Sequence, residues 1–528
     1  MSDTEGRLLR SGAIVGAGVV ASRITGLLRT LTVTAVLGTS AFADAYNFAN
    51  NVPNIVYELV AGGVLSAALL PVVVDLDRRN DTAGLRSVLS RTVGAVVLLA
   101  LLAVLAAPLL GDLIARLGGG GVDAAESREA AVVLLRWFLP QIAFYGVMTA
   151  VVAILHARGR FALAAFAPMA NNLVTIAAFV AASLLTSSDL TVLSLRATLD
   201  ERWVVTVVAA GTTLGVAVNA GLLVAGLRGS GVLRPTLRAA PALGRLRQAA
   251  VGALGVVVVT QVSVVITASL AKRYGGLGDY SAYTYANLLF FVVYGIVAVS
   301  VTTAVAPEFA RAADDEDRFG AEVARGVRLL CLLVVPAALG LAALATPVAA
   351  ALPLRDEAAG RTAAILVWFA LGLAPYALLQ LVLRACWARE DRRTPLVLVG
   401  VQQVALVLPA VVLGPLVGIR GVASAFAIGY AIGAVVALRH LVVGLGVVGR
   451  ADLVVLGRIL GCAVVSAVVA AGLDRGVLGR LGLGAEGRVL VGAAVGAVVY
   501  VLALTVSGGG EEVRLARRMI PTRRSASG

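Results

Sequence analysis

The sequence predicts an all-α polytopic membrane protein with about fourteen transmembrane helices, built as two six-helix lobes related by a parallel repeat plus two extra C-terminal helices. Three observations support this prediction: the composition, a series of long apolar segments and an internal repeat. Of the 528 residues, 59% are hydrophobic and 14% are charged, and the mean hydropathy is +0.95. Ordinary globular domains are about 45–50% apolar and about 25% charged. The composition therefore excludes a soluble enzyme, a secreted disulfide scaffold and a disordered chain.

Long apolar segments follow one another along almost the whole chain. A helix of about 20 apolar residues crosses a hydrocarbon core of about 30 Å. We expect fourteen such spans, at residues 11–37, 43–74, 88–115, 130–155, 161–186, 203–227, 249–271, 281–309, 323–350, 362–386, 395–417, 421–438, 452–472 and 488–506.

The arginines and lysines give the orientation of these spans. An even number of spans places both termini on one side of the membrane. The segments on that side carry more than twice as many Lys and Arg residues as the opposite loops. The positive-inside rule then predicts that both termini are cytoplasmic. The heavy use of Ala, Val, Gly and Arg is typical of a GC-rich bacterial genome, so we expect the membrane to be a bacterial plasma membrane. The same rule accounts for the net charge of +14, so we expect no nucleic-acid partner.

Part of the chain repeats at a spacing of 237 residues. The segment that begins at Asp44 resembles the segment that begins at Ser281. The identical pairs are Ala45/Ala282, Tyr46/Tyr283, Ala49/Ala286, Asn50/Asn287, Tyr57/Tyr294, Ala61/Ala298 and Ala67/Ala304. A weaker match relates Ala157-Arg158 to Ala388-Arg389. Both matches are six spans apart, and an even step preserves direction, which predicts a parallel repeat; chance similarity between two Ala/Val-rich helices is the alternative.

The repeat suggests four parts of the chain. We expect an N-lobe at residues 1–228 with spans one to six, and a C-lobe at 229–443 with spans seven to twelve. Spans thirteen and fourteen occupy 444–507, and a basic cytoplasmic tail occupies 508–528.

Sequence motifs for catalysis or ATP hydrolysis are absent. The chain has one lysine, Lys272, and it does not stand in a Walker A loop. The two histidines and three cysteines have no metal-ligand spacing. We therefore expect a transporter rather than an enzyme, with no catalytic residues, no metal site and no cofactor.

Two arginines inside span one are the strongest functional signal. Arg23 lies near mid-span, and Arg29 lies about two turns further along. Ionised groups in a span are costly and usually functional. Because arginine stays charged and offers a planar donor fork, the pair suits capture of a phosphate-like anion. The alternative is a structural arginine paired with a neighbouring carboxylate.

Span two is unusually polar for a membrane helix. Asp44, Asn50, Asn54 and Glu58 are candidate substrate-binding residues, with Asn287 of span eight as the repeat partner of Asn50. For Asp44 the alternative is an interfacial position, for Glu58 an ion pair with an arginine, and for the asparagines helix–helix contacts. The pair Gly62-Gly63 in the same span allows close helix packing or a hinge.

The motifs from Ser22 to Pro71 resemble those of the MurJ/MviN family of lipid II flippases, and most of all its actinobacterial branch. They read Ser-Arg-x-x-Gly-x-x-Arg, Leu-Gly-x-x-x-x-x-Asp-Ala-Tyr, Pro-Asn and Gly-Gly-x-x-Ser-x-x-x-x-Pro. This family belongs to the multidrug/oligosaccharidyl-lipid/polysaccharide exporter superfamily. The resemblance implies flipping of the lipid-linked peptidoglycan precursor from the inner to the outer leaflet by alternating access without ATP hydrolysis. It also implies that Arg23 and Arg29 hold the lipid diphosphate and that Asp44 is important.

The resemblance further implies lipid II, an undecaprenyl-diphosphate-linked disaccharide peptide, as substrate. Membrane lipids and cell-wall synthesis proteins are expected as further partners, and the membrane potential or a monovalent ion as the driving force. Two family arginines are replaced, by Tyr57 and by Leu288. The alternatives are an exporter of another polyprenyl-linked glycan, a cation-coupled drug antiporter of the same superfamily, a membrane glycosyltransferase and a cell-wall assembly scaffold.

Overall fold

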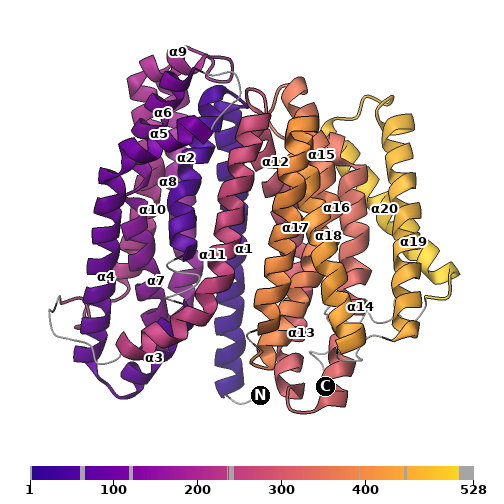
Figure 1. The fold of residues 1–528 in the computed structure, drawn as a ribbon, viewed down its shortest axis with the longest axis horizontal. Coiled ribbons are helices and arrows are strands. Elements are labelled where there is room, and N and C mark those ends of the chain that lie inside the picture. The colour runs from indigo at the N-terminus through magenta and orange to yellow at the C-terminus, as the bar shows by residue number, and fades with distance from the viewer. Residues whose placement is uncertain are drawn as a thin grey trace. The chain divides into compact units, whose positions relative to one another are not determined.

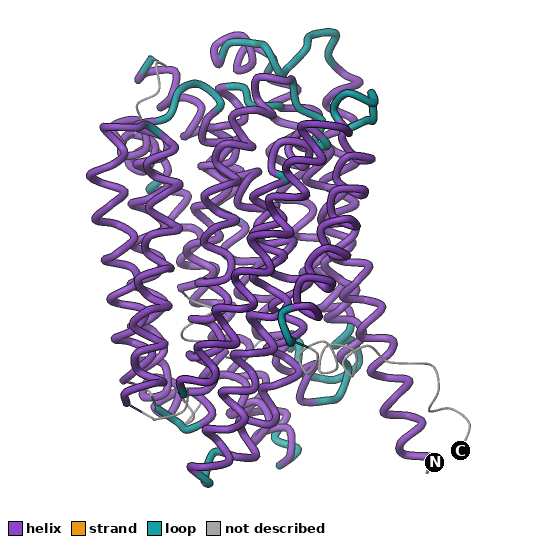
Figure 2. Tube along the Cα trace, turned by 90° about the vertical axis from the view of Figure 1, so that its right-hand side faces the viewer, coloured by secondary structure: helices purple, strands orange, loops and turns teal. Residues whose placement is uncertain are grey.

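The computed structural model describes residues 3–59, 66–117, 123–234, 236, 243–391, 393–444 and 449–509. Within these residues the regular structure is helical, and Figure 2 shows helices joined by loops without a strand. The predicted all-α class is thereby confirmed. The glycines Gly62-Gly63 and nearly all of the predicted basic tail lie outside the described residues.

The helices follow one another in a regular series along the chain (Figure 1). Their bounds are α1 (Asp3–Leu37), α2 (Ala41–Tyr57), α3 (Ser66–Arg78), α4 (Thr82–Leu105), α5 (Ala107–Leu117), α6 (Ala124–Phe138), α7 (Gln141–Ala157), α8 (Phe161–Leu185), α9 (Leu195–Asp200), α10 (Arg202–Ala225), α11 (Leu243–Tyr274), α12 (Asp279–Val293), α13 (Val299–Ala312), α14 (Glu316–Ala343), α15 (Ala345–Ala350), α16 (Asp356–Ala388), α17 (Arg393–Val417), α18 (Ile419–Arg439), α19 (Arg450–Leu473) and α20 (Ala485–Val506). Three π-helical turns, η2 (Tyr294–Ala298), η3 (His440–Gly444) and η4 (Asp474–Leu478), follow α12, α18 and α19.

Thirteen of the described helical segments are long and apolar enough to cross a membrane. They correspond to thirteen of the fourteen predicted spans. The remaining span, 43–74, corresponds to α2 and α3, which lie on either side of undescribed residues and are each shorter than a full span. The predicted third span, 88–115, is divided at Ala106, because Pro108 suits the first turn of a new helix.

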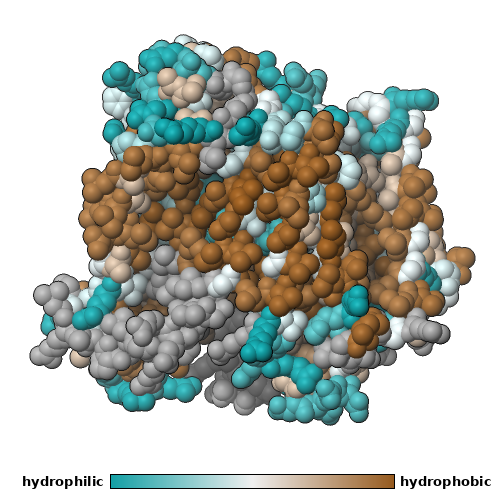
Figure 3. Space-filling view, viewed as in Figure 1, coloured by the Kyte–Doolittle hydropathy of each residue, from teal (hydrophilic) through white to brown (hydrophobic). Residues whose placement is uncertain are grey.

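Apolar side chains cover the middle of the helices. Figure 3 shows hydrophobic residues over the central parts of the helices and hydrophilic residues at their ends. Many large apolar side chains are exposed, among them Leu184 at 80% and Leu490 at 72%. On a soluble protein such a surface would aggregate, whereas on a membrane protein it faces lipid. The protein is therefore a multi-pass membrane protein.

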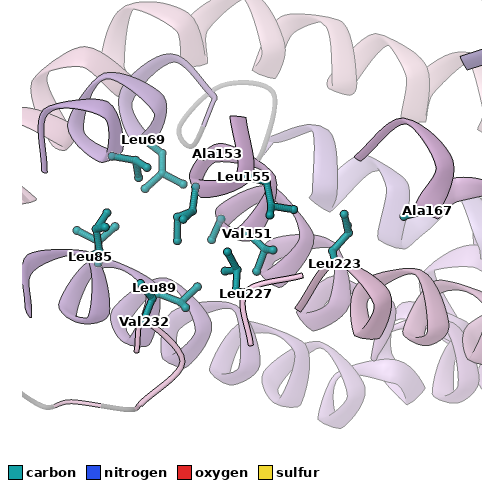
Figure 4. Close-up of a cluster of buried hydrophobic side chains, with 14 residues drawn as sticks. Leu69, Leu85, Leu89, Val151, Ala153, Leu155, Ala167, Leu223, Leu227 and Val232 are labelled. Atoms are coloured by element: carbon teal, nitrogen blue, oxygen red, sulfur yellow. The ribbon is translucent and has the colours of Figure 1, made fainter. Parts of the chain in front are cut away.

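The contacts divide the chain into two compact units, residues 1–281 and 282–528. The lobe boundary predicted at residue 228 from the repeat stays a prediction. In the first unit α8 packs against α1 and α10, while α2 packs against α6 and α7. A buried cluster joins α3, α4, α7 and the end of α10, with Leu69, Leu85, Val151 and Leu223 among its members (Figure 4).

The loop after α10 is held against the first unit. Its residues Leu227 and Val232 enter the buried cluster of Figure 4. The Arg160 Nη1 donates to the Gly226 carbonyl at 2.8 Å, and Arg86 donates through Nε to the Gly231 carbonyl. The start of the connection between spans six and seven is therefore part of the folded unit.

The second unit is built around α16, α17 and α18. The helix α14 packs against α16 and α19, and α19 packs against α20. A small cluster with Ile459, Ala463 and Leu504 fixes the last two spans to α14. At one end of this pair, Arg488 donates twice to Asp474, at 2.8 and 2.9 Å. This bidentate ion pair closes the α19–α20 hairpin.

Matching contacts within each unit support the predicted repeat. In the first unit the Tyr46 ring meets Phe138 at 5.4 Å, and in the second the Tyr283 ring meets Phe369 at 5.0 Å. Likewise Tyr57 meets Tyr145 at 4.9 Å, and Tyr294 meets Tyr376 at 4.8 Å. The first partners are 237 residues apart and the second partners 231. These are the spacings of the two matches found in the sequence.

The glycines that allow close helix packing are also duplicated. A Cβ on Gly215 of α10 would lie 2.5 Å from the Asn171 side chain of α8. A Cβ on Gly433 of α18 would lie 2.8 Å from the Gln402 side chain of α17. Both helix pairs therefore approach each other through a glycine set against an amide side chain.

Candidate functional site

The two predicted arginines lie on α1, which hydrogen bonds from α8 hold in place. Asn172 of α8 donates to the Ser22 carbonyl at 3.2 Å and to Thr25 Oγ1 at 3.1 Å. Arg23 is exposed and Arg29 is partly buried. Within the described part of the chain neither arginine forms an ion pair or a hydrogen bond. The alternative of a structural arginine paired with a carboxylate therefore has no support among these residues.

Arg29 lies within electrostatic range of two phenol groups, those of buried Tyr46 and partly buried Tyr145. The Tyr46 hydroxyl shares a hydrogen bond of 2.8 Å with Thr212 Oγ1, and the Tyr145 hydroxyl donates to Gln141 Oε1 at 3.2 Å. Polar groups of the first unit that bond to one another therefore lie within electrostatic range of the guanidinium.

The hydrogen bonds of Tyr145 continue across three helices. Gln141 of α7 donates through Nε2 to Thr213 Oγ1 of α10 at 2.9 Å, and Thr213 donates to the Trp137 carbonyl of α6 at 2.6 Å. Because each group bonds to its neighbour, these polar groups tolerate burial.

The second half of α2 and the residue that follows it carry three of the predicted residues. Asn50 and Asn54 are partly buried and Glu58 is exposed. The Asn54 amide donates to the Asn50 carbonyl at 2.9 Å, one turn back along the same helix. Tyr57, the last residue of α2, packs its ring on Tyr145. This region therefore offers amides, a phenol and one carboxylate.

Asp44 lies near the start of α2 and is 8% exposed. Its Oδ1 accepts from the Ser281 N–H and from Ser281 Oγ, each at 2.7 Å, and its Oδ2 accepts from the Gly278 N–H at 2.9 Å. Asn47 donates to the same Ser281 hydroxyl at 3.1 Å. The carboxylate thus ties α2 to the connection between α11 and α12. Its predicted contact with substrate stays a prediction.

The connection held by Asp44 requires a glycine. Gly278 has a φ of +79°, and a Cβ there would collide with the Thr39 carbonyl oxygen. Lys272 lies 5.3 Å from the centre of the Phe48 ring and interacts electrostatically with Asp44. Charge, hydrogen bonds and backbone shape all fix this junction.

Asn287 belongs to the second unit, in α12, and is partly buried. In the first unit, Arg23 and Arg29 lie on α1, and Asp44, Asn50 and Asn54 lie on α2 with Glu58 directly after it. Asp44 differs from the other α2 residues because its carboxylate bonds to Gly278 and Ser281.

The phenols and hydroxyls around Arg29 were missed by the sequence reasoning. Their signal was present in the repeat, because Tyr46 and Tyr57 are two of its identical positions. The partner residues Gln141 and Tyr145 stand in α7, and Thr212 stands in α10. Only the packing of α2, α7 and α10 brings them together.

The second unit contains a large apolar cavity. Its volume is about 690 Å³, and its walls come from α12, α14, α15, α19 and α20. The Tyr500 hydroxyl in its lining donates to the Leu332 carbonyl at 2.9 Å, and Ser466 donates to the Gly496 carbonyl at 2.6 Å. Because these polar groups are satisfied internally, the cavity suits an apolar ligand such as an alkyl chain.

A sequence model of the family described as "Lipid II flippase MurJ" matches residues 33–490 of the chain. The chain belongs to the MurJ family. Members of this family are transporters and not enzymes, in agreement with the prediction from the sequence. The resemblance found in the Ser22–Pro71 motifs is thereby confirmed over most of the chain.

Relatives from other bacteria cover most of this MurJ-family chain. "Probable lipid II flippase MurJ" of Vibrio cholerae is 29% identical over 405 residues, which is 74% of each chain. The protein of the same description from Rhizobium meliloti is 28% identical over 477 residues, 88% of this chain and 86% of the relative. "Lipid II flippase MurJ" of Burkholderia cenocepacia is 27% identical over 436 residues, 80% of this chain and 81% of the relative.

Solved structures show the same fold. "Lipid II flippase MurJ, inward closed conformation" matches with a TM-score of 0.76 at 19% identity, and the match covers 94% of this chain and 98% of that one. An inward-facing multidrug resistance MATE transporter of the MOP superfamily matches with a TM-score of 0.65 at 15% identity over 79% of this chain and 94% of that one.

Proposed function

We propose that this protein flips lipid II, the polyprenyl-diphosphate-linked peptidoglycan precursor, from the cytoplasmic to the outer leaflet of the bacterial plasma membrane. The observation that carries the proposal is the pair of arginines on α1, Arg23 and Arg29, without ion-pair partners among the described residues. A drug antiporter for cations would need acidic groups at this place, whereas free guanidinium groups suit an anion. Membership of the MurJ family supports lipid II as that anion.

The arginines lower the free-energy cost of moving the diphosphate across the membrane. An isolated charge is excluded from hydrocarbon, but a charge-assisted, bidentate hydrogen bond to a guanidinium offsets much of its lost hydration. Arg29 lies within electrostatic range of the Tyr46 and Tyr145 phenols, and exposed Arg23 can meet the headgroup first. Asn50 and Asn54 of α2, with Glu58 directly after it, supply hydrogen bonds to the sugars and peptide. Asn287 of the second unit stays a predicted substrate-binding residue.

The apolar cavity between α14, α19 and α20 provides a place for the polyprenyl chain. Its lining is almost entirely aliphatic and its polar atoms are already bonded. The chain then stays in an apolar environment while the headgroup crosses. Spans thirteen and fourteen, which have no counterpart in the repeat, supply two of the cavity's walls.

The Asp44 carboxylate forms a contact at the predicted outer end of α2. It holds Gly278 and Ser281 at the α11–α12 connection by three hydrogen bonds. Alternating access requires that such a contact forms in one state and breaks in the other. We assign to Asp44 this gating role alongside its predicted contact with substrate.

We further propose that the membrane potential, with or without a monovalent ion, drives export, that both termini are cytoplasmic and that cell-wall synthesis proteins are partners. An interior-negative potential favours outward movement of an anion by about 2.3 kcal/mol per charge per 100 mV. This supports export without ATP and without a bound cofactor.

The first experiment measures lipid II exposed on the cell surface after depletion of this protein. Wild type is expected to restore exposure, and Arg23→Ala is expected to fail at equal protein level. The matched control is Thr260→Ala, because Thr260 stands at the repeat position of Arg23 in α11 and bonds only to its own helix, at the Val256 carbonyl. Full rescue by Arg23→Ala would contradict the mechanism. Unchanged exposure after depletion would favour another polyprenyl-linked glycan as substrate.

A further inference from the structure

A small cavity with charged walls lies at one end of the second unit, separate from the apolar cavity. Its volume is about 300 Å³, and its walls are the start of α14, the end of α16 with the loop that follows, and η3. The residues that matter for its chemistry are Glu316, Phe319, Arg389, Asp391, His440 and Leu441.

The position of this cavity corresponds to the level of lipid headgroups. It is formed where α16 and α18 end and α14 begins, so it lies at span ends that share the predicted cytoplasmic side with both termini. Trp387, 51% exposed, stands two residues before Arg389 on α16. Tryptophan is enriched at membrane–water interfaces.

Arg389 is only loosely engaged. Its Nη2 lies 3.6 Å from Glu316 Oε1, beyond a normal hydrogen bond, and the Glu316 side chain is 82% exposed. The guanidinium lies over the Phe319 ring at 5.2 Å from its centre. Stacking on Phe319 orients the donor fork while leaving N–H groups for another acceptor.

Asp391 and His440 form the opposite part of the wall. The Asp391 carboxylate accepts from the Arg393 and Thr394 N–H groups at 2.9 and 3.1 Å. Burial opposes its ionisation, but the hydrogen bonds from Thr394 and Arg393 and the nearby His440 hold the pKa of Asp391 below its ordinary value. The cavity therefore combines two nitrogen donors, on Arg389 and His440, with two carboxylates, Glu316 and Asp391.

The corresponding arginine of the first unit is bound differently. Arg158, the repeat partner of Arg389, bonds to Asp77 at 3.0 Å, and both side chains are about one quarter exposed, at 24% and 25%. Arg158 and Asp77 therefore satisfy each other as an ion pair. In contrast, Arg389 of the second unit keeps N–H groups for an additional partner.

We propose that this cavity binds the phosphoethanolamine headgroup of a membrane phospholipid. The phosphate accepts hydrogen bonds from Arg389 and His440, and the primary ammonium donates to Glu316 and Asp391. Phe319 and Leu441 cover the glycerol end. A bound lipid of this kind connects α14, α16 and η3. The site does not depend on which lipid the protein transports.

The test uses the full-length protein in nanodiscs of phosphatidylcholine with added phosphatidylethanolamine or phosphatidylglycerol, and native mass spectrometry of the retained lipid. Wild type is expected to retain phosphatidylethanolamine about tenfold more than either other lipid, because choline lacks N–H donors and glycerol lacks the ammonium. Arg389→Gln is expected to remove this retention. Glu316→Gln is expected to reduce the preference over phosphatidylglycerol. Arg393→Gln removes the same charge next to the cavity but not in its lining, and should match wild type.

Competition with soluble glycerophosphoethanolamine separates the two sources of this headgroup. Displacement of the lipid only at millimolar concentration indicates that the acyl chains contribute and supports a lipid site. Displacement at micromolar concentration would overturn the lipid assignment in favour of a soluble ligand. Equal retention of all three lipids, or loss of retention in Arg393→Gln as in Arg389→Gln, would overturn the proposal.

Discussion

Spans two and eight begin with nearly the same sequence but are surrounded differently. Around Tyr46 and Tyr57 of α2 the neighbours are the Phe138, Phe179 and Tyr145 rings, the Thr212 hydroxyl and, within electrostatic range, Arg29. Around α12, at the repeat position of Pro53, stands Phe290, whose ring meets Phe369 and Phe426 at 6.1 and 5.2 Å. The duplicated tyrosine pairs thus maintain the same helix packing in both units. The first unit uses the remaining volume for polar groups, whereas the second fills it with aromatic rings.

The two spans also change their helical form at the same place. Residues 58–59 after α2 are π-helical, and η2 begins at Tyr294, the repeat partner of Tyr57. Single π-turns inside helices are common at functional sites. The repeat therefore preserves a change of helical form in the middle of each span, while the polar groups around the two spans differ.

The comparison predicts that transport depends on the polar first unit. Arg29→Ala is expected to lower lipid II export at least tenfold, because it removes a charge-assisted contact to the diphosphate worth more than about 1.4 kcal/mol. Export would be measured as surface lipid II at equal protein level. Ile266→Ala, at the repeat position of Arg29, is the control and should change export less than twofold. Similar losses in both variants would contradict the proposed division of roles.

Substitutions of Asp44 test the hydrogen bonds that join α2 to Gly278 and Ser281. Asp44→Ala leaves two N–H groups and one hydroxyl without their acceptor, so we expect unfolding in detergent to become easier by about 3 kcal/mol and export to fall several-fold. Asp44→Asn keeps one acceptor oxygen and should give an intermediate Tm. If Asp44→Ala kept the wild-type Tm, the hydrogen bonds to Gly278 and Ser281 would not stabilise the junction.

The smallest expected effect concerns a single hydrogen bond in the network. Tyr46→Phe removes the bond to Thr212, and hydrogen bonds between membrane helices average about 0.6 kcal/mol. A double-mutant cycle with Thr212→Val should recover a coupling of that size from unfolding measurements. A coupling near zero would show that the Tyr46 ring alone, packed on Phe138 and Phe179, positions this helix.

Much of the fold could be predicted because each span carries its own signal. Thirteen spans were recognisable from length and hydropathy, and the remaining span is the one whose polar residues and Pro53 made it exceptional. The repeat was visible through a few tyrosines and asparagines. The candidate site was less predictable, since nothing in the sequence around Asp44 indicated that its carboxylate bonds to Gly278 and Ser281.

The sequence by itself determined the class of protein, the spans and the presence of arginines within a membrane helix. These properties depend on local composition, because a helix satisfies its own backbone in lipid and its side chains alone decide whether it inserts. Only the tertiary structure decided which polar groups meet. Tyr46 and its hydrogen-bond partner Thr212 are 166 residues apart, and their contact depends on how α2 and α10 are placed by the packing of the first unit. The same holds for the cavity at Arg389, since three helix ends must converge before its charges form a site.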